Sequence, residues 1–340
     1  MFRVILLGGT VISLFFVPWI LVKAWILPLP NTIQEQVDET LSHGFDGMIV
    51  YVDKGKQSPQ FYTAGWHDKQ LQLPAKPDAL FKIASISKLY VAVSIAKLAN
   101  TNRLSLDQTL AEYFPELVGK IEHADSITLR LMVQHRSGIP NFTDSAEFWS
   151  DAPENKKSAL DYALDMPTSF APDKGYEYSN TNYLLLRQII AQVTGYSHEK
   201  YIKDAVLTPL GLNNTFFSLN DIDDINNVMS GYYVGIDEDF KTSEYGMLAT
   251  AQDVGIFLRA LNDGSVFTNS AEQAIYHDIY VYEHGGLVPG YQSLAEYHKD
   301  IDAVVVQFIN TTDFNGYEWN LSEISINRIV SILKNEHQKE

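Results

Sequence analysis

Residues 85–98 constrain the fold of this chain most, because they are apolar on nearly every face of a helix. Such a helix is stable only when the rest of the protein surrounds it, so we expect it at the centre of the fold. Ser85 and Lys88 stand at its start. Residues three apart share one helix face, so the lysine amine can reach the serine hydroxyl and activate it as a nucleophile.

Strand-like patterns near both ends of the chain enclose a mostly helical middle. Alternating or continuous apolar strands are expected at 48–53, 60–64, 279–282, 292–297 and 303–309. Helical patterns occur at 107–114, 128–135, 157–164, 181–194, 250–261 and 321–333. These patterns predict an α+β fold with one antiparallel sheet built from both chain ends, flanking helices and an inserted, mostly helical lobe. The last helix is expected to cover one face of the sheet.

The N-terminal region carries a run of 19 residues, 4–22, without a charge. About 20 apolar residues span a bilayer as a helix, whereas a signal-peptide core has roughly 7–15, so the length favours an uncleaved anchor. Trp19 and Trp25 lie where interfacial aromatic residues are expected. We therefore predict two parts: residues 1–30 as a membrane anchor or signal segment with its tether, and residues 31–340 as one folded domain.

The composition excludes several classes of protein. The formal net charge of −17 argues against nucleic-acid partners, which require clustered Lys and Arg. The absence of cysteine removes disulfides, thiol catalysis and thiolate metal sites. No His-Glu-x-x-His spacing or Gly-x-Ser-x-Gly turn occurs, and the acidic loop 220–227 lacks the glycine and final glutamate of a calcium loop. We expect neither a cofactor nor a metal.

A Ser-x-x-Lys spacing also arises by chance, but a second segment carries groups that fit the same chemistry. Tyr178 and Asn180 are one residue apart, so in an extended or turn segment their side chains can point the same way. The phenol can take part in proton transfer, and the amide can hold a substrate carbonyl or orient a lysine. The alternative is a simple turn in which Asn180 caps the helix that follows.

A third segment, residues 283–291, contains the pair Gly285-Gly286. Glycine in a strand lets another backbone approach closely, so an edge strand here can bind an extended substrate. Such a strand can also supply an N–H group to a developing oxyanion. The alternative is a tight β-turn that uses the two glycines.

Together these segments resemble the three motifs of the penicillin-recognising serine hydrolases, in the branch of class C β-lactamases, DD-peptidases and esterases. The motifs occur in the family's order, separated by 93 and 106 residues: Ser85-x-x-Lys88, Tyr178-x-Asn180 and His284-x-Gly286. Residues 127–140, which end in His-Arg-Ser-Gly-Ile-Pro, also resemble a family segment. The resemblance covers about residues 45–335 and implies a β-lactamase/transpeptidase-like fold.

The resemblance implies catalytic roles for Ser85, Lys88 and Tyr178. Ser85 would be the acylated nucleophile, and the other two would move its proton and pass it to the leaving group. Unperturbed lysine and tyrosine have pKa values of about 10.4 and 10, so a base active near neutral pH needs a lowered pKa. Burial lowers the pKa of lysine, and a nearby ammonium lowers that of tyrosine. The two groups titrate as a pair, so the sequence does not assign the proton to either.

The resemblance also implies substrate-binding roles. The backbone N–H groups of Ser85 and Leu287 would form the oxyanion hole, and Asn180 would contact the lysine or the substrate amide. His284 and Gly286 would line the strand edge against which the substrate lies. Many β-lactamases have lysine at the position of His284, whereas histidine is common in the peptidases and esterases.

The function expected from the resemblance is a serine hydrolase that acts through an acyl-enzyme on an amide or ester, of the DD-peptidase or esterase type. The alternatives are a true class C β-lactamase and a non-catalytic penicillin-binding or sensor domain. Class C β-lactamases carry a substrate-binding glutamine in the loop where this chain has Asn141 and Phe142. This difference favours a peptidase or esterase over a β-lactamase. The expected partners are a small or peptide-like acyl substrate and a membrane that holds the N-terminal segment. We expect a monomer in the bacterial envelope with its domain outside the cytoplasm, periplasmic or secreted if the segment is cleaved.

Overall fold

The computed structural model describes residues 16–55, 57–150, 156–164 and 166–339. The chain divides into two compact units. The first, here called the sheet unit, comprises Met1–Ala84, Ser218–Gly255 and Gly285–Glu340. The second, the helical unit, comprises Ser85–Phe217 and Ile256–His284. The helical unit is thus inserted into the sheet unit along the sequence.

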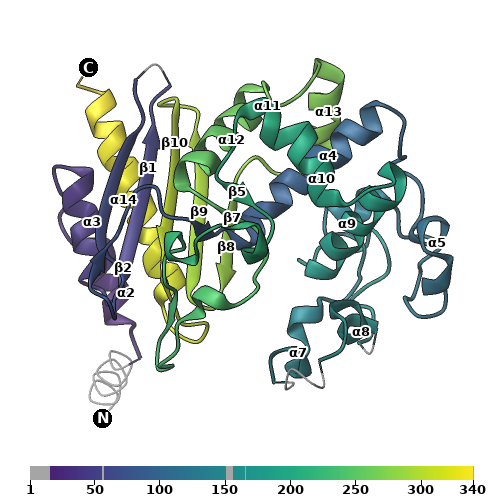
Figure 1. Ribbon diagram of the computed structural model, residues 1–340, viewed down its shortest axis with the longest axis horizontal. Helices are drawn as coiled ribbons and strands as arrows, with labels where there is room; N and C mark the ends of the chain where they lie inside the picture. The colour runs from purple at the N-terminus through teal and green to yellow at the C-terminus, as the bar shows by residue number, and fades with distance from the viewer. Residues whose placement is uncertain (1–15, 56, 151–155, 165, 340) are drawn as a thin grey trace, which may run out of the picture. The chain divides into compact units, whose positions relative to one another are not determined.

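The sheet unit contains a six-stranded sheet with the order β3-β2-β1-β10-β9-β8 (Figure 1). The strands from the N-terminal part are β1 (Gly47–Asp53), β2 (Gln60–Asp68) and β3 (Leu73–Pro74). Those from the C-terminal part are β8 (His284–Val288), β9 (Tyr291–His298) and β10 (Ala303–Ile309). The two sets join where β1 pairs antiparallel with β10, from Met48 opposite Ile309 to Asp53 opposite Val304. The prediction of an antiparallel sheet built from both chain ends is confirmed.

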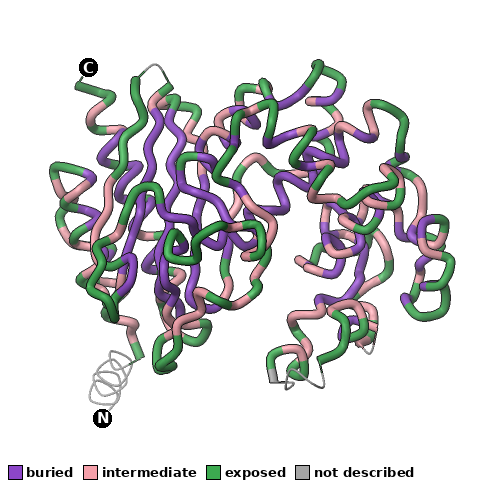
Figure 2. The backbone as a smooth tube through the Cα atoms, viewed as in Figure 1, coloured by how far each residue is buried: buried purple, intermediate pink, exposed green. Residues whose placement is uncertain are grey.

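The central strands are covered on both faces, which is why they are continuously apolar. Every residue of β1 and β10 is buried (Figure 2). Alternate residues such as Val50 and Val305 belong to a core cluster with Ile329 and Leu333 of the terminal helix. On the opposite face, Phe308 stacks on Phe81 with ring centroids 4.4 Å apart. A strand buried on both faces loses the polar alternation of a half-exposed strand.

Helices α3 (Ile33–Leu41) and α14 (Glu318–His337) cover one face of this sheet, as predicted for the terminal helix (Figure 1). Thr32 begins α3 with a capping box shared with Glu35. Short strand pairs complete the sheet unit: β4 (Phe81–Lys82) pairs with β7 (Leu248–Ala249), and β6 (Tyr232–Tyr233) pairs with β11 (Thr311–Thr312).

The helical unit is built around α4 (Ser87–Asn100), whose residues from Ser87 to Ala96 are all buried. Tyr90 of α4 stacks on Phe257 with ring centroids 3.7 Å apart. The expected central helix is therefore present, preceded by one 3₁₀ turn, Ala84–Ile86. The unit also contains strand β5 (Thr215–Phe216) and α5 (Leu110–Tyr113), α6 (Leu129–Val133), α7 (Ala146–Ser150), α8 (Ala159–Leu164), α9 (Asn180–Thr194), α10 (His198–Ile202), α11 (Thr208–Leu210) and α13 (Ser270–Ile279). Helix α12 (Ala251–Asp263) begins in the sheet unit and ends in the helical unit.

The prediction of a strand at residues 279–282 is wrong. Helix α13 runs to Ile279, and the strand of this region begins only at His284. The helix starts where the side chain of Asn269 accepts the N–H of Glu272, and it buries Tyr276 and Ile279 one turn apart. Only Ile279 of the four predicted residues lies in the helix, and residues 280–282 form the link to β8. In that link the carbonyl of Val281 accepts the hydroxyl of Tyr276, and Tyr280 stacks on His284. These tertiary contacts outweigh the strand propensity of the β-branched and aromatic residues.

Most of the predicted anchor, residues 4–15, lies outside the described residues. Its remainder enters α2 (Trp19–Ile26), which begins directly after Pro18. In the parts of the chain that the structure describes, no helix combines the length and apolar character needed to cross a bilayer. Ala24 is buried in the core cluster, and Arg328 of α14 donates hydrogen bonds to the carbonyls of Leu27 and Pro28. The tether after α2 is thus attached to the sheet unit, while a domain boundary at residue 30 stays a prediction.

Candidate active site

Ser85 lies in the 3₁₀ turn that leads into α4, and the side chain of Lys88 lies beside it. Nζ of Lys88 is 3.0 Å from Oγ of Ser85, which is hydrogen-bond distance. Ala84, directly before the serine, has a φ of +47°, in the left-handed region that a residue with a Cβ seldom adopts. Such backbone strain persists only where the surrounding structure imposes it, and it is concentrated at functional sites.

Tyr178 reaches the same serine from the segment before α9. Its hydroxyl donates a hydrogen bond of 2.7 Å to Oγ of Ser85. The amine of Lys88 lies 4.9 Å from the centroid of the Tyr178 ring. The nucleophile predicted from the first motif and the tyrosine of the second, 93 residues apart in the sequence, therefore meet in the helical unit.

Asn180, the first residue of α9, holds the amine of Lys88. Its Oδ1 accepts a hydrogen bond of 2.7 Å from Nζ. Its Nδ2 donates to Oδ1 of Asn141 and to Oγ1 of Thr143, both at 3.2 Å. Because the amide nitrogen faces these two acceptors, the oxygen faces the lysine.

Asn141 is a site residue that sequence reasoning missed. It lies in the loop where class C β-lactamases carry a glutamine, and its Oδ1 also accepts the backbone N–H of Asn180 at 3.0 Å. The side chain of Asn141 is 7 % exposed, and its Nδ2 donates to Asp144. The only local signal was a polar residue directly after the Ser-Gly-Ile-Pro turn.

Burial determines the charge of the two proton-transfer candidates. Desolvation, assisted by the positive charge of Arg187, holds the pKa of Lys88 well below its usual range. Burial raises the pKa of Tyr178 to about 12, although its hydrogen bond to Ser85 opposes that shift. Burial thus favours the neutral amine of Lys88 and the neutral phenol of Tyr178.

The third motif contributes His284 to the helical unit, and its ring centroid is 6.2 Å from that of Tyr178. Gly286 belongs to β8 in the sheet unit, where a Cβ would lie 2.3 Å from the carbonyl oxygen of Ile83 and 3.1 Å from Cβ of Ala84. The strand therefore passes directly beside the residues that precede Ser85, and only glycine allows that approach. A role for the N–H of Leu287 stays a prediction.

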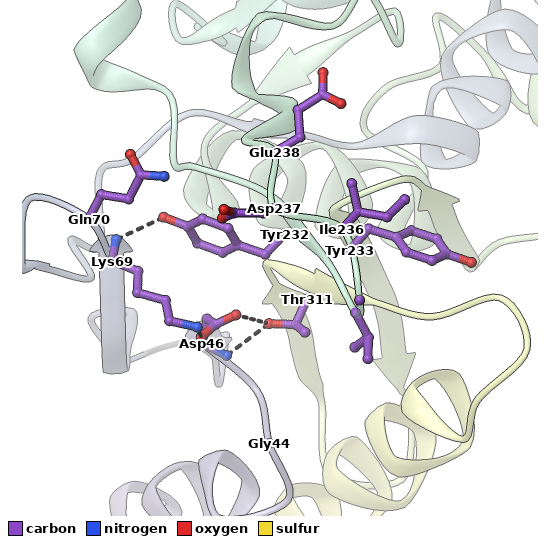
Figure 3. Close-up of a pocket in the computed structure, with 12 residues that line it drawn as sticks. Gly44, Asp46, Lys69, Gln70, Tyr232, Tyr233, Ile236, Asp237, Glu238 and Thr311 are labelled. Atoms are coloured by element: carbon purple, nitrogen blue, oxygen red, sulfur yellow. Dashed lines mark hydrogen bonds and ion pairs between the residues drawn. The ribbon is translucent and has the colours of Figure 1, made fainter.

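Among the hollows in the described part of the molecule, two differ in their relation to the three motifs. One, of about 270 Å³, is lined by Tyr178 and His284 together with Gln134, His135, Tyr176 and Tyr280 among others. The other, of about 360 Å³, lies in the sheet unit, where Lys69 pairs with Asp46 at 2.7 Å and the hydroxyl of Tyr232 accepts the N–H of Lys69 (Figure 3). Two motif residues, Tyr178 and His284, line the first hollow, and no motif residue lines the second.

Sequence comparisons give a family match. A family model described as Beta-lactamase matches residues 29–278. The protein flp of Staphylococcus aureus (strain N315) is 29 % identical over 199 residues, which is 56 % of this chain and 39 % of that protein. Penicillin-binding protein 4* of Bacillus subtilis (strain 168) is 28 % identical over 185 residues, 52 % of this chain and 39 % of the relative. The matches thus span about two fifths of the length of these curated relatives.

Solved structures give a fold match. The D-amino acid amidase of Ochrobactrum anthropi SV3, complexed with L-phenylalanine, has a TM-score of 0.79 and 23 % identity, over 90 % of this chain and 99 % of that chain. A penicillin-binding protein of Bacillus halodurans has a TM-score of 0.73 and 19 % identity, over 89 % and 99 %. An octameric penicillin-binding protein homologue of Pyrococcus abyssi has a TM-score of 0.71 and 20 % identity, over 88 % and 77 %. The expected fold is confirmed, while the expected monomer stays a prediction.

Proposed function

Because the chain belongs to the Beta-lactamase family, we propose that it is a serine hydrolase that forms an acyl-enzyme at Ser85. One observation carries the proposal: Oγ of Ser85 lies within 3.0 Å of both the amine of Lys88 and the hydroxyl of Tyr178. A serine hydroxyl is a weak nucleophile unless an adjacent base removes its proton. A buried neutral amine supplies that base, and the phenol beside it supplies an acid.

Acylation proceeds in three proton transfers. Oγ of Ser85 attacks the substrate carbonyl carbon, and its proton moves to the neutral amine of Lys88. The tetrahedral intermediate then collapses, and the bond to the leaving nitrogen or oxygen breaks as the hydroxyl of Tyr178 donates its proton to that atom. The ammonium stabilises the phenolate and returns a proton to it. In deacylation, water attacks the carbonyl carbon of the ester and gives one proton to the same pair. The bond between the acyl group and Oγ of Ser85 then breaks, and the pair returns a proton to Oγ.

The remaining motif residues bind the substrate in this proposal. The N–H groups of Ser85 and Leu287 stabilise the oxyanion. His284 and Gly286 line the strand that the substrate follows, and the close approach of β8 to Ile83 supports this role. Asn180 orients the amine of Lys88 through the 2.7 Å contact.

The substrate we propose is an amide or ester of a small or peptide-like acyl group, with an activity of the DD-peptidase, amidase or esterase type. The D-amino acid amidase and the penicillin-binding proteins among the similar proteins support an amide substrate. The hollow beside Tyr178 and His284 opens next to the proton donor and suits the leaving group.

We also propose that residues 4–22 anchor the protein in the membrane, with the domain outside the cytoplasm of a bacterium. The support is the uncharged run of 19 residues flanked by Arg3 and Lys23. Trp19, inside this run, is 56 % exposed, and Trp25, just after it, is 76 % exposed.

The test is labelling of the full chain with a fluorescent penicillin and with a fluorophosphonate, followed by intact mass and turnover assays. We expect one adduct on Ser85, loss of labelling in Ser85→Ala, and a loss of turnover on the order of 10⁴–10⁶-fold in that variant. Ser94→Ala is the matched control, because the hydroxyl of Ser94 lies in the same helix and bonds only to the carbonyl of Tyr90.

The outcomes separate the alternatives. Hydrolysis of D-amino acid amides, D-Ala-D-Ala peptides or p-nitrophenyl esters supports the proposal. Rapid turnover of nitrocefin identifies a β-lactamase instead, and labelling without turnover of any substrate identifies a binding domain. A folded protein that takes neither probe contradicts acyl-enzyme chemistry.

A further inference from the structure

His135 holds the backbone on both sides of Tyr178. Its carbonyl oxygen accepts the N–H of Glu177 at 3.0 Å. Its ring nitrogen Nδ1 accepts the N–H of Ser179 at 3.1 Å. The two amides that flank the tyrosine are therefore both bound to one residue, which lies 43 positions earlier in the chain.

The imidazole of His135 also contacts the tyrosine ring. The two rings stack with centroids 4.5 Å apart and an interplanar angle of 25°. His135 is 2 % exposed, and on another side its ring stacks on Tyr183 at 5.1 Å. Tyr178 is thus held through two backbone hydrogen bonds and one ring face, while its hydroxyl reaches Ser85.

The backbone of His135 adopts a conformation that is unfavourable for a residue with a side chain. It follows the end of α6 with a φ of +56°, in the left-handed region. Glycine is the residue that adopts this conformation at a helix end without steric cost. A histidine here accepts backbone strain, which persists when other interactions require that side chain.

The hydrogen bond to Ser179 also determines the protonation of the ring. Nδ1 can accept an N–H only if it carries no proton, so the proton of the neutral ring is on Nε2. Nε2 has no hydrogen-bond partner among the described residues. The pKa of His135 is lowered to about 3, mainly by burial and to a smaller extent by electrostatic interaction with Lys88 and His284. The ionisable groups near the ring are Lys88, Tyr176, Tyr178, Tyr183, Tyr280 and His284.

We propose that His135 is a positioning residue for Tyr178. Its neutral imidazole accepts the N–H of Ser179 and stacks on one face of the phenol ring, while its backbone carbonyl accepts the N–H of Glu177, and these contacts keep the hydroxyl aligned on Ser85. The inference rests on the proposed function, in which Tyr178 donates the proton to the leaving group. In this role His135 acts through Tyr178, although it also lines the hollow proposed for the leaving group. Its loss should affect the chemical step more than substrate binding, because a small displacement of a catalytic group costs rate.

The test compares His135→Asn with His135→Leu in the full chain. The amide oxygen of asparagine can occupy the position of Nδ1 and accept the N–H of Ser179, whereas leucine fills the space without an acceptor. We expect His135→Leu to lower kcat about 100-fold with KM changed less than about threefold. His135→Asn should recover at least about tenfold of that loss. His123→Leu is the matched control, because His123 also has a left-handed φ, +62°, and lies beside Glu122.

Rates are normalised to the fraction of enzyme that a stoichiometric acylating probe titrates, so loss of folded protein does not count as loss of kcat. Nitrogen NMR of the histidines should find His135 neutral, with its proton on Nε2, from pH 5 to pH 9. A ring that titrates near pH 6.5, or an asparagine variant as slow as the leucine variant, overturns the inference. Normal kcat in His135→Leu overturns this inference alone, whereas a wild-type chain that no probe acylates overturns the proposed function and this inference together.

Discussion

The amide oxygen of Asn180 lies 2.7 Å from the amine of Lys88. Asn141 and Thr143 hold the other end of that amide, so its orientation is determined by residues of a different loop. A neutral acceptor at this position orients the amine without stabilising its charged form as a carboxylate would. The contact therefore fixes the lysine beside Ser85 without opposing the lowering of its pKa by burial.

Asn180→Asp should convert this contact into an ion pair. The new carboxylate favours the ammonium form, so the pKa of Lys88 rises and less neutral amine is present at pH 7. We expect labelling of Ser85 to be about 10–100-fold slower at pH 7 and to recover as the pH increases. The measurement is the rate of labelling from pH 6 to pH 10, with Asn220→Asp in the exposed acidic loop as the control. An unchanged pH profile would contradict the role of the amide.

Lys88→Met should change how stability depends on pH. The pKa of Lys88 is lower in the folded protein than in the unfolded chain, so the unfolded chain binds more protons between the two values. Its contribution to the free energy of unfolding therefore rises with pH through that window and levels off above about 10.5, the ordinary lysine value. Urea unfolding at pH 7 and pH 9 should show a smaller gain in the methionine variant than in wild type. An equal gain would mean that Lys88 is charged in the folded state.

Gly286→Ala tests the approach of β8 to the turn before Ser85. The new Cβ would lie 2.3 Å from a backbone oxygen, which cannot move aside as a side chain can. We expect a loss of about 1–3 kcal/mol in the free energy of unfolding and slower acylation of the variant.

Gly285→Ala is the control for that variant, because its nearest atoms are side-chain carbons of Trp319 and Leu294, at 2.7 and 3.1 Å. The two proteins are compared by urea unfolding and by the rate of probe labelling. Equal effects of the two substitutions would show that the backbone approach of Gly286 is not special.

Truncation separates the anchor from the packed tether. Removal of residues 1–15 should move the protein from the membrane fraction to the soluble fraction with its thermal stability unchanged. Removal of residues 1–30 also deletes Ala24 and both carbonyls that Arg328 binds. Arg328 keeps Gln36 and Glu39 as acceptors but loses two others. The loss of acceptors by a buried guanidinium costs about 1–3 kcal/mol, so this second variant should have a clearly lower Tm. Equal Tm values of the two truncated proteins would refute the stabilising role of residues 16–30. A full chain found in the soluble fraction would refute the membrane anchor.

Sequence reasoning anticipated the features that depend on local spacing. Ser85 and Lys88 share a helix face because they are three residues apart, and that relation holds in any fold. The strands 48–53 and 303–309 are recognisable because continuous apolar runs mark strands covered on both faces. The strand predicted at 279–282 is absent, because α13 runs to Ile279 and residues 280–282 form the link to β8. The contribution of Asn141 was invisible because a single asparagine after a turn has no periodic signature.

By itself, the sequence determined which groups could react and in what order they occur along the chain: Ser85 with Lys88, then Tyr178 with Asn180, then His284 with Gly286. It left open whether the lysine or the tyrosine carries the proton. Only the tertiary structure supplies the environment of the two groups, because a pKa depends on desolvation by residues distant in the chain and on the charges packed nearby. Burial of Lys88 beside Arg187 lowers its pKa and favours the neutral amine, whereas burial of Tyr178, which stacks on His135, raises its pKa and favours the phenol.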